Sequence, residues 1–274
     1  MKNKFRLVDA HCHVWPGSVH DFKTVSTTFP DDRIPIDYSI EVHFKRLELL
    51  TIDAAVLVPH IAYYGRQIGY ALECAKKYPG KCAVMGAITQ NEIKHPQLLV
   101  DDLSNGVRSF RIRAIDLIQP IDLLCEFLES SSCVLCPLLT RHQSQDGGLI
   151  RVAELAKKYA NLVFVLDHFG GDCSVDALRK FVELPNVLIK ISDFGSFDLP
   201  PYDHAKRVTV ELTKIFGSHR LMWGSNNPVF ELDPLQNLIK AFQSVKDTDQ
   251  ISEHDKNNIF GGTADQIFFS NKES

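Results

Sequence analysis

The chain has 274 residues, of which 45% are hydrophobic and 23% are charged, and its formal net charge at pH 7 is -4. A chain of this length can bury a large core, so we expect one domain over residues 1–274. The mildly acidic balance disfavours nucleic acid and anionic membrane surfaces as partners, because both select basic patches. A small, acidic molecule is the expected partner. The composition is also compatible with a homo-oligomer.

The first residues lack the apolar core of a signal peptide, and no stretch approaches the roughly 18 apolar residues of a membrane span. We therefore expect a cytoplasmic protein. Its seven cysteines are expected to be free thiols, because disulfides are rare in that compartment. Cys133 and Cys136 form a CxxC pair inside a strand-like run, where residues three apart lie on opposite faces, so buried thiols are favoured there over a metal site.

Short β-rich runs alternate along the chain with longer amphipathic stretches, taken here in order. The predicted strands cover residues 5–10, 54–59, 82–88, 107–112, 133–138, 162–167, 187–192 and 221–224. The predicted helices cover residues 39–50, 67–77, 95–104, 121–129, 149–159, 175–182, 204–216 and 234–245. Eight such units predict an α/β fold, a single-domain (β/α)8 TIM barrel. An open doubly wound sheet is disfavoured, because no GxGxxG sequence follows the first strand.

Polar residues at the ends of these strands are the candidates for chemistry, because the active site of a parallel barrel forms there. His11 and His13 end the first strand, and alternation along a strand would place both imidazoles and Asp9 on one face. His168 follows the sixth strand, and Asn226 follows the eighth, which neighbours the first in a closed barrel. We expect His11, His13, His168 and Asn226 to meet; the alternative is a set of solvated loop histidines.

Other strand ends carry candidates for substrate binding. Arg111 ends the fourth strand and Arg141 follows the fifth, and a guanidinium can bind a substrate carboxylate with two hydrogen bonds or form a structural salt bridge. Tyr64 follows the second strand, where a phenol can bind substrate or pack at the rim. Asp193 follows the seventh strand and is expected to orient a loop or a substrate hydroxyl. The long polar loop at residues 14–37 is of the kind that covers active sites, and five more histidines are expected at the surface: His20, His43, His95, His219 and His254.

Five short motifs occur in one order between residues 5 and 269. They are DAHCHVW at 9–15, GVRSFR at 106–111, LDHFGG at 166–171, KIS at 190–192 and RLMWGS at 220–225. Together they resemble the amidohydrolase-related subfamily that contains dicarboxylate lactonases and sugar lactonases. The resemblance implies a TIM barrel that hydrolyses small lactones or related acids. It also implies either one divalent metal, with zinc expected, or no metal, as in some members.

On this resemblance, His11, His13 and His168 are the expected metal ligands, or they polarise the substrate carbonyl. Lys190 lies inside the seventh strand, away from the fourth strand where the superfamily's bridging lysine occurs, so a binuclear centre is not expected. A metal-dependent decarboxylase of the same superfamily is the alternative enzyme.

Asn226 departs from the family pattern Gly-Ser-Asp-x-Pro, whose aspartate activates water. An amide is neutral, cannot act as a general base and binds zinc more weakly than a carboxylate does. Three explanations stay open: an engineered inactive variant, a natural non-catalytic ligand-binding barrel, and a reaction that does not need this base.

Overall fold

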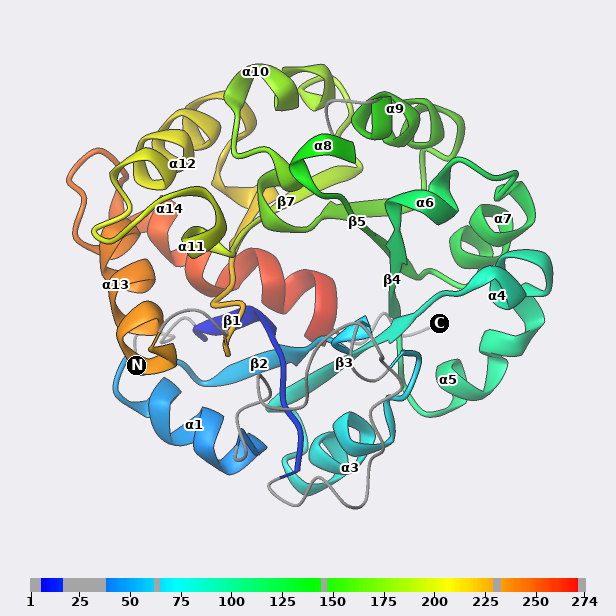
Figure 1. Cartoon of the computed structure of the whole chain (residues 1–274), viewed down its shortest axis with the longest axis horizontal. Coiled ribbons are helices and arrows are strands. Elements are labelled where there is room, and N and C mark those ends of the chain that lie inside the picture. Colours follow the sequence, from blue (N-terminus) through cyan, green and yellow to red (C-terminus); the bar gives the residue numbers. More distant parts are fainter. Residues whose placement is uncertain (1–5, 17–37, 62–64, 144–146, 229–232, 271–274) are drawn as a thin grey trace.

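Eight parallel strands stand side by side in chain order, and helices surround them (Figure 1). The computed structural model describes residues 6–16, 38–61, 65–143, 147–228 and 233–270. The strands are β1 (Val8–Cys12), β2 (Ala54–Leu57), β3 (Cys82–Ala87), β4 (Ser109–Arg113), β5 (Val134–Leu138), β6 (Val163–Leu166), β7 (Val187–Ile191) and β8 (Leu221–Trp223). Each overlaps its predicted range, and the predicted (β/α)8 barrel is confirmed. Most of the predicted loop at 14–37 lies outside the described residues.

Several helices begin at a capping side chain that the sequence carries. Ser39 caps α1 by accepting a hydrogen bond from the Val42 backbone N–H, and Asp233 caps α13 ahead of Pro234 in its first turn. The α-helices are α1 (Ile40–Glu48), α3 (Gly69–Lys77), α4 (Gln90–Lys94), α5 (Val100–Ser104), α6 (Ala114–Leu117), α7 (Asp122–Ser130), α8 (Arg141–Gln143), α9 (Leu149–Lys158), α10 (Val175–Leu178), α11 (Phe194–Phe197), α12 (Asp203–Phe216), α13 (Pro234–Lys246) and α14 (Glu253–Asn257). Shorter 3-10 segments are η2 (Pro96–Leu99), η4 (His168–Gly171), η5 (Arg179–Phe181) and η6 (Ser218–Arg220), and two π-helical segments are η7 (Asn258–Gly262) and η8 (Asp265–Phe269). Within the described ranges, no helix has the length and apolar character needed to cross a membrane.

The predicted helix at 95–104 is wrong as a single helix. Here α4 ends at Lys94 with His95 as its C-cap, and Pro96 begins η2 before α5 follows. Proline lacks an N–H donor and disfavours helical backbone in the residue before it, so a continuous helix through Pro96 is disrupted.

The apolar core has two parts, one inside the barrel and one between the strands and the helices. The inner part is made mainly of small and branched residues: Val8, Ala10, Ala54, Val56, Val58, Met85, Val134, Cys136, Val165, Leu188, Met222 and Ala264. The outer part is larger and holds the inward faces of the helices. Cys136 lies in the inner part and Cys133 in the outer part, as expected for strand residues three apart, and all seven cysteines are free thiols.

The barrel closes where β1 meets the segment that follows β8. Asn226 N–H donates to the His11 carbonyl at 2.8 Å, and His13 N–H donates to the Asn227 carbonyl at 2.7 Å. A Cβ added at Gly224 would lie 2.7 Å from the Cβ of His11, so only glycine permits this approach. Closure therefore carries His11, His13 and Asn226 to one place.

A C-terminal helical segment, from α14 to η8, covers the amino-terminal end of the barrel; the sequence did not predict it. In Figure 1 this red segment crosses the middle of the ring of strands. Its Ala264 belongs to the inner core, and Phe268 packs against that core. A Cβ added at Gly261 would overlap the backbone carbonyl of Arg6, just before β1.

We expect Gly261→Ala to destabilise the fold by about 1–3 kcal/mol or more, the usual cost of overpacking, because the obstacle is backbone and cannot turn aside. Urea unfolding measures this. Gly262→Ala is the matched control, since the nearest atom to its Cβ would be the Asn258 side-chain oxygen at 3.1 Å, and the nearest backbone atom, the Asn257 carbonyl oxygen, would lie at an ordinary 3.6 Å. Equal stability of the two variants would show that the segment does not press on the start of β1.

Candidate active site

An extra residue in β1 turns both strand-end imidazoles toward the barrel interior. Between Asp9 and Cys12, β1 advances three residues while β2 advances two, which is the register shift of a bulge. His11 and His13 consequently face inward, with ring centroids 5.2 Å apart. The expectation that Asp9 shares their face is wrong, because strict alternation does not continue through a bulge.

Asp9 instead joins β1 to its neighbours on the helix side of the barrel. It accepts hydrogen bonds from Ser225 N at 2.8 Å, from Ser225 Oγ at 2.6 Å and from His11 N at 3.1 Å, and it lies 3.3 Å from His43 Nε2. His43 is fully buried, so its predicted surface position is wrong, whereas His95, His219 and His254 are exposed as predicted. His20 lies outside the described residues.

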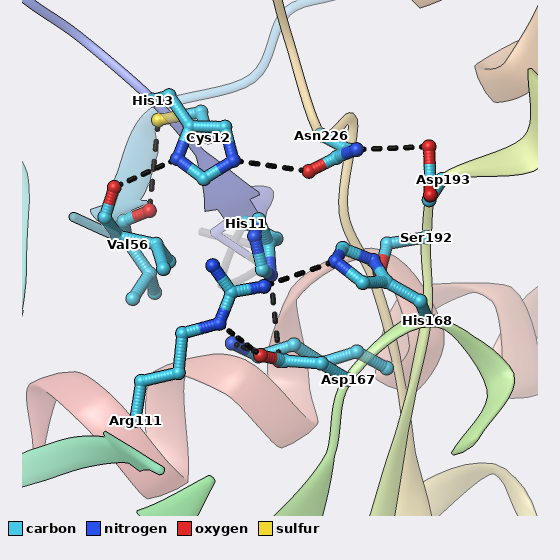
Figure 2. Close-up of polar contacts among 12 residues, drawn as sticks. His11, Cys12, His13, Val56, Arg111, Asp167, His168, Ser192, Asp193 and Asn226 are labelled. Atoms are coloured by element: carbon cyan, nitrogen blue, oxygen red, sulfur yellow. Dashed lines mark hydrogen bonds and ion pairs between the residues drawn. The ribbon is translucent and has the colours of Figure 1, made fainter. Parts of the chain in front are cut away.

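The Asp167 carboxylate, at the end of β6, gathers three partners inside the barrel (Figure 2). Arg111 Nε donates to it at 2.9 Å, Lys190 Nζ lies 3.1 Å away and His11 Nδ1 lies 3.4 Å away. Burial alone would raise the pKa of Asp167, but the charges of Lys190 and Arg111 hold that pKa well below its ordinary value. Asp167 is therefore a permanent anion, balanced by two buried cations.

His168 is held between two partners that fix its tautomer. Its Nε2 lies 3.1 Å from Arg111 Nη2, and its Nδ1 lies 2.9 Å from Ser192 Oγ. A guanidinium can only donate, so Nε2 accepts and Nδ1–H donates to Ser192. Burial lowers the pKa of His168, so the imidazole is neutral at pH 7.

A third group runs across the closure of the barrel. His13 Nδ1–H donates to the Val58 carbonyl at 2.8 Å, and Asn226 Oδ1 lies 3.2 Å from His13 Nε2. The amide of Asn226 in turn donates from Nδ2 to Asp193 Oδ1 at 2.9 Å, as Figure 2 shows. The amide thus donates to a carboxylate, while its oxygen lies against the unprotonated Nε2 of His13, whose single proton is on Nδ1.

Three of these residues have left-handed backbone conformations just beyond their strands. The φ angles are 52° at His168, 61° at Asp193 and 54° at Asn226. Such angles cost residues with side chains on the order of 1–3 kcal/mol and gather at functional sites. Each one turns the chain sharply after β6, β7 or β8 and directs a polar side chain into the barrel mouth.

A cavity of about 610 Å³ opens over these groups. Its described lining includes His13, Arg111, His168, Asp193 and Asn226. Arg141 lines it too, although its side chain is 75% exposed and pairs with Asp172 at 3.0 Å. The structure thus brings together most of the predicted site residues, with His11 directly beneath; Tyr64 lies outside the described residues.

Sequence reasoning missed Asp167 and Lys190 as members of the site. Lys190 is the second-last residue of β7, and its side chain is fully buried. A charged residue inside an apolar strand has to be paired, which was the available signal. Asp167 precedes His168, and its role depends on partners from three other strands.

Three residues could in principle hold a metal ion here: His11, Asp167 and His168, whose ligand atoms all lie within 4.8 Å of one another. This set shares two members with the predicted one and replaces His13 by Asp167. It does not fit a divalent cation as arranged. Arg111 donates to His168 Nε2, and together with Lys190 it already neutralises Asp167. An added dication would lie close to two fixed positive charges, which repel it.

The amidohydrolase family model matches residues 148–269 of this chain. No curated protein matches the sequence significantly. Among solved structures, the chain is similar to a probable 2-pyrone-4,6-dicarboxylic acid hydrolase from Acinetobacter baumannii with citric acid bound. The TM-score is 0.76 at 18% identity, over 96% of this chain and 99% of that one.

Two further structures differ in what they bind or do. An amidohydrolase from Burkholderia multivorans with bound zinc gives a TM-score of 0.72 at 20% identity, covering 96% of this chain and 98% of the other. A 5-carboxyvanillate decarboxylase from Sphingomonas paucimobilis gives 0.63 at 14% identity, covering 97% and 99%. The solved structures confirm the barrel, and the family match confirms the predicted resemblance to amidohydrolases.

We expect stability to fall as the pH falls from about 6.5, the ordinary histidine pKa, toward 4.5. Burial lowers the pKa of His11, His13 and His168, and it lowers that of His60 to about 3. Below pH 6.5 the unfolded chain binds protons that the folded chain refuses, so unfolding is favoured. Urea unfolding at pH 7.5, 6.5, 5.5 and 4.5 measures the slope.

Each such histidine changes the free energy of unfolding by at most about 1.4 kcal/mol per pH unit. His60→Gln should therefore reduce the slope of that free energy against pH by the contribution of one histidine. The low pKa of Asp167 does not enter, because its unfolded form is protonated only below about pH 4. A free energy of unfolding that stays constant from pH 7.5 to 4.5 would contradict the neutral imidazoles.

Proposed function

We propose that the protein hydrolyses a small lactone, or a related ester, that carries a carboxylate group. The observation that supports this most directly is the arrangement of Arg111. Its Nε and Nη2 are held by Asp167 and His168, while Nη1 has no hydrogen-bond partner among the described residues. A fixed guanidinium whose Nη1 amino group is free at the wall of a cavity suits a developing oxyanion or a substrate oxygen.

The imidazoles lie around the Arg111 guanidinium, and none of them accepts a hydrogen bond from its Nη1 among the described residues. His168 presents its Nε2 lone pair to Arg111, so Arg111 takes over the role of polarising the carbonyl that the sequence resemblance gave to the histidines. His11 and His13 are neutral and buried, and they shape the apolar and polar walls beside the carbonyl. Asn226 is proposed to position its neighbours without exchanging a proton.

The carboxylate of the substrate is proposed to meet the outer part of the cavity. Arg141 lines the cavity, and its side chain remains exposed to solvent although it pairs with Asp172. An exposed guanidinium can bind a second anion without a large desolvation cost. Two arginines at different depths therefore favour a substrate with a reacting carbonyl at one end and an acid at the other.

Two other functions are each favoured by one specific observation. The similarity to a 5-carboxyvanillate decarboxylase supports decarboxylation of an aromatic acid in the same cavity. Asn226 by itself supports a barrel that binds an acid without turnover.

The decisive experiment is an assay panel of carboxylated lactones, matched neutral lactones and aromatic carboxylic acids. We expect ring opening of a carboxylated lactone, weaker turnover of its neutral counterpart and no release of CO₂ from the acids. Release of CO₂ without ring opening would favour the decarboxylase, and tight binding with no reaction would favour the non-catalytic barrel.

Arg111→Met sharpens this assay, because removing a donor from the developing oxyanion lowers kcat by about 10²–10³-fold. Arg113→Met is the matched control: Arg113 lies on the same strand, pairs with Asp116 at 3.1 Å and is half exposed. A variant at 111 that loses stability but keeps its kcat would make Arg111 purely structural.

Zinc, the predicted metal, is the subject of a separate test, and the crowded positive charges favour the metal-free form of the reaction. We expect activity to stay within about twofold after dialysis against a chelator, because Arg111 supplies the electrostatic stabilisation. Elemental analysis and activity are measured on the same sample. Loss of activity on chelation, restored by zinc alone, would show that the metal, and not Arg111, stabilises the developing charge.

A further inference from the structure

We infer that Asp193 is the carboxylate that accepts a proton from the attacking water, in place of the carboxylate absent at position 226. This inference rests on the proposed hydrolysis. It assigns a catalytic residue to the chain as it stands and gives Asn226 a different task, which is to orient that carboxylate.

The two oxygens of Asp193 have different surroundings. Oδ1 accepts the hydrogen bond from Asn226 Nδ2 at 2.9 Å, whereas Oδ2 has no donor among the described residues. The side chain is half-buried and lines the cavity together with Asn226. One oxygen is therefore anchored and the other is available to a water molecule in the cavity.

Asp193 also differs from the other acid of this cavity. Among the described lining residues, the carboxylates are Asp172 and Asp193. Asp172 forms an ion pair with Arg141 at 3.0 Å, while Asp193 bonds only to a neutral amide. Asp172 is therefore already occupied by a cation, whereas one oxygen of Asp193 faces the cavity without a donor among the described residues.

The backbone at the end of β7 aims consecutive side chains at the two halves of the site. Ser192 accepts from His168 Nδ1–H at 2.9 Å, and Asp193, with φ at 61°, turns away to Asn226. Ser196 N–H donates to the Asp193 carbonyl at 3.1 Å and fixes this turn. The carboxylate is therefore held beside the imidazole that contacts Arg111.

This arrangement explains the amide at position 226. An aspartate there would place two carboxylates about as far apart as the 2.9 Å bond that now joins Asn226 to Asp193. Like charges at that distance cannot both ionise, so one would hold a proton. The Asn226 amide instead donates to Asp193 and adds no second negative charge beside it.

The chemical step is a balanced addition of water. Asp193 takes one proton from water as the oxygen forms a bond to the lactone carbonyl carbon, and the carbonyl π electrons move to its oxygen beside Arg111. Collapse of this intermediate breaks the ring C–O bond, and the leaving oxygen receives the proton from Asp193. The product is the hydroxy acid, and Asp193 is regenerated as a carboxylate.

The test compares Asp193→Asn, Asn226→Asp and the double exchange of both residues, using kcat and KM for the best lactone of the panel. We expect Asp193→Asn to lower kcat by about 10²–10⁴-fold, the usual share of a general base, with KM changed by less than threefold. Asparagine tolerates a left-handed backbone, so the fold should persist, as thermal melting will show. We expect the double exchange to recover at least tenfold over Asp193→Asn, because it retains one carboxylate bonded to one amide.

Asp203→Asn is the control, because it removes an exposed carboxylate at the start of α12 that is not itself part of the cavity lining. It should leave kcat unchanged. A rise of two decades or more in Asn226→Asp, with Asp193→Asn equal to the parent, would overturn the role of Asp193 and leave the proposed hydrolysis intact. No turnover of any lactone by any of these proteins would overturn both.

Discussion

The Asp167 carboxylate and its buried partners are the interaction on which the positions of the other site residues depend. Arg111 comes from β4, Lys190 from β7 and His11 from β1, and all of them converge on one acid at the end of β6. Removing one member of a buried charge set typically costs about 3–5 kcal/mol, because the remaining charge loses its partner. The set therefore ties four strands together at the height where the cavity begins.

This charge set links the two ends of the barrel. Lys190 Nζ lies 5.3 Å from the centre of the Phe268 ring, which belongs to the C-terminal segment that covers the amino-terminal end. The opposite side of the set contacts His168 through Arg111. Packing at the closed end thus supports the ammonium, the ammonium supports Asp167, and Asp167 orients the guanidinium that faces the cavity.

The left-handed residues beyond β6, β7 and β8 are strained backbone positions at the mouth of the barrel, and the rest of the fold has to offset their cost in free energy. The residues next to each of them in the chain are buried, so the surrounding structure can hold His168, Asp193 and Asn226 in conformations that unfolded chains rarely adopt. Pre-set side chains need no rearrangement when a substrate enters, which is the physical basis of electrostatic preorganisation. Asn226 fits this scheme as a neutral donor that holds Asp193 in place beside His13.

The sequence by itself determined the barrel and the strand ends at which chemistry occurs. Alternation of apolar strands and amphipathic helices is a local pattern, and the residues that follow each strand are placed by chain order alone. Thus His11, His13, His168, Arg111 and Asn226 could be assigned to one site. Only the tertiary structure decided the direction of each side chain and its partner. The bulge in β1 separates Asp9 from the imidazoles, Arg111 reaches a residue 56 positions away, and Asp193 meets Asn226 across 33 positions. Such pairings arise from the closure of the barrel, which brings distant residues together, and no local pattern records them.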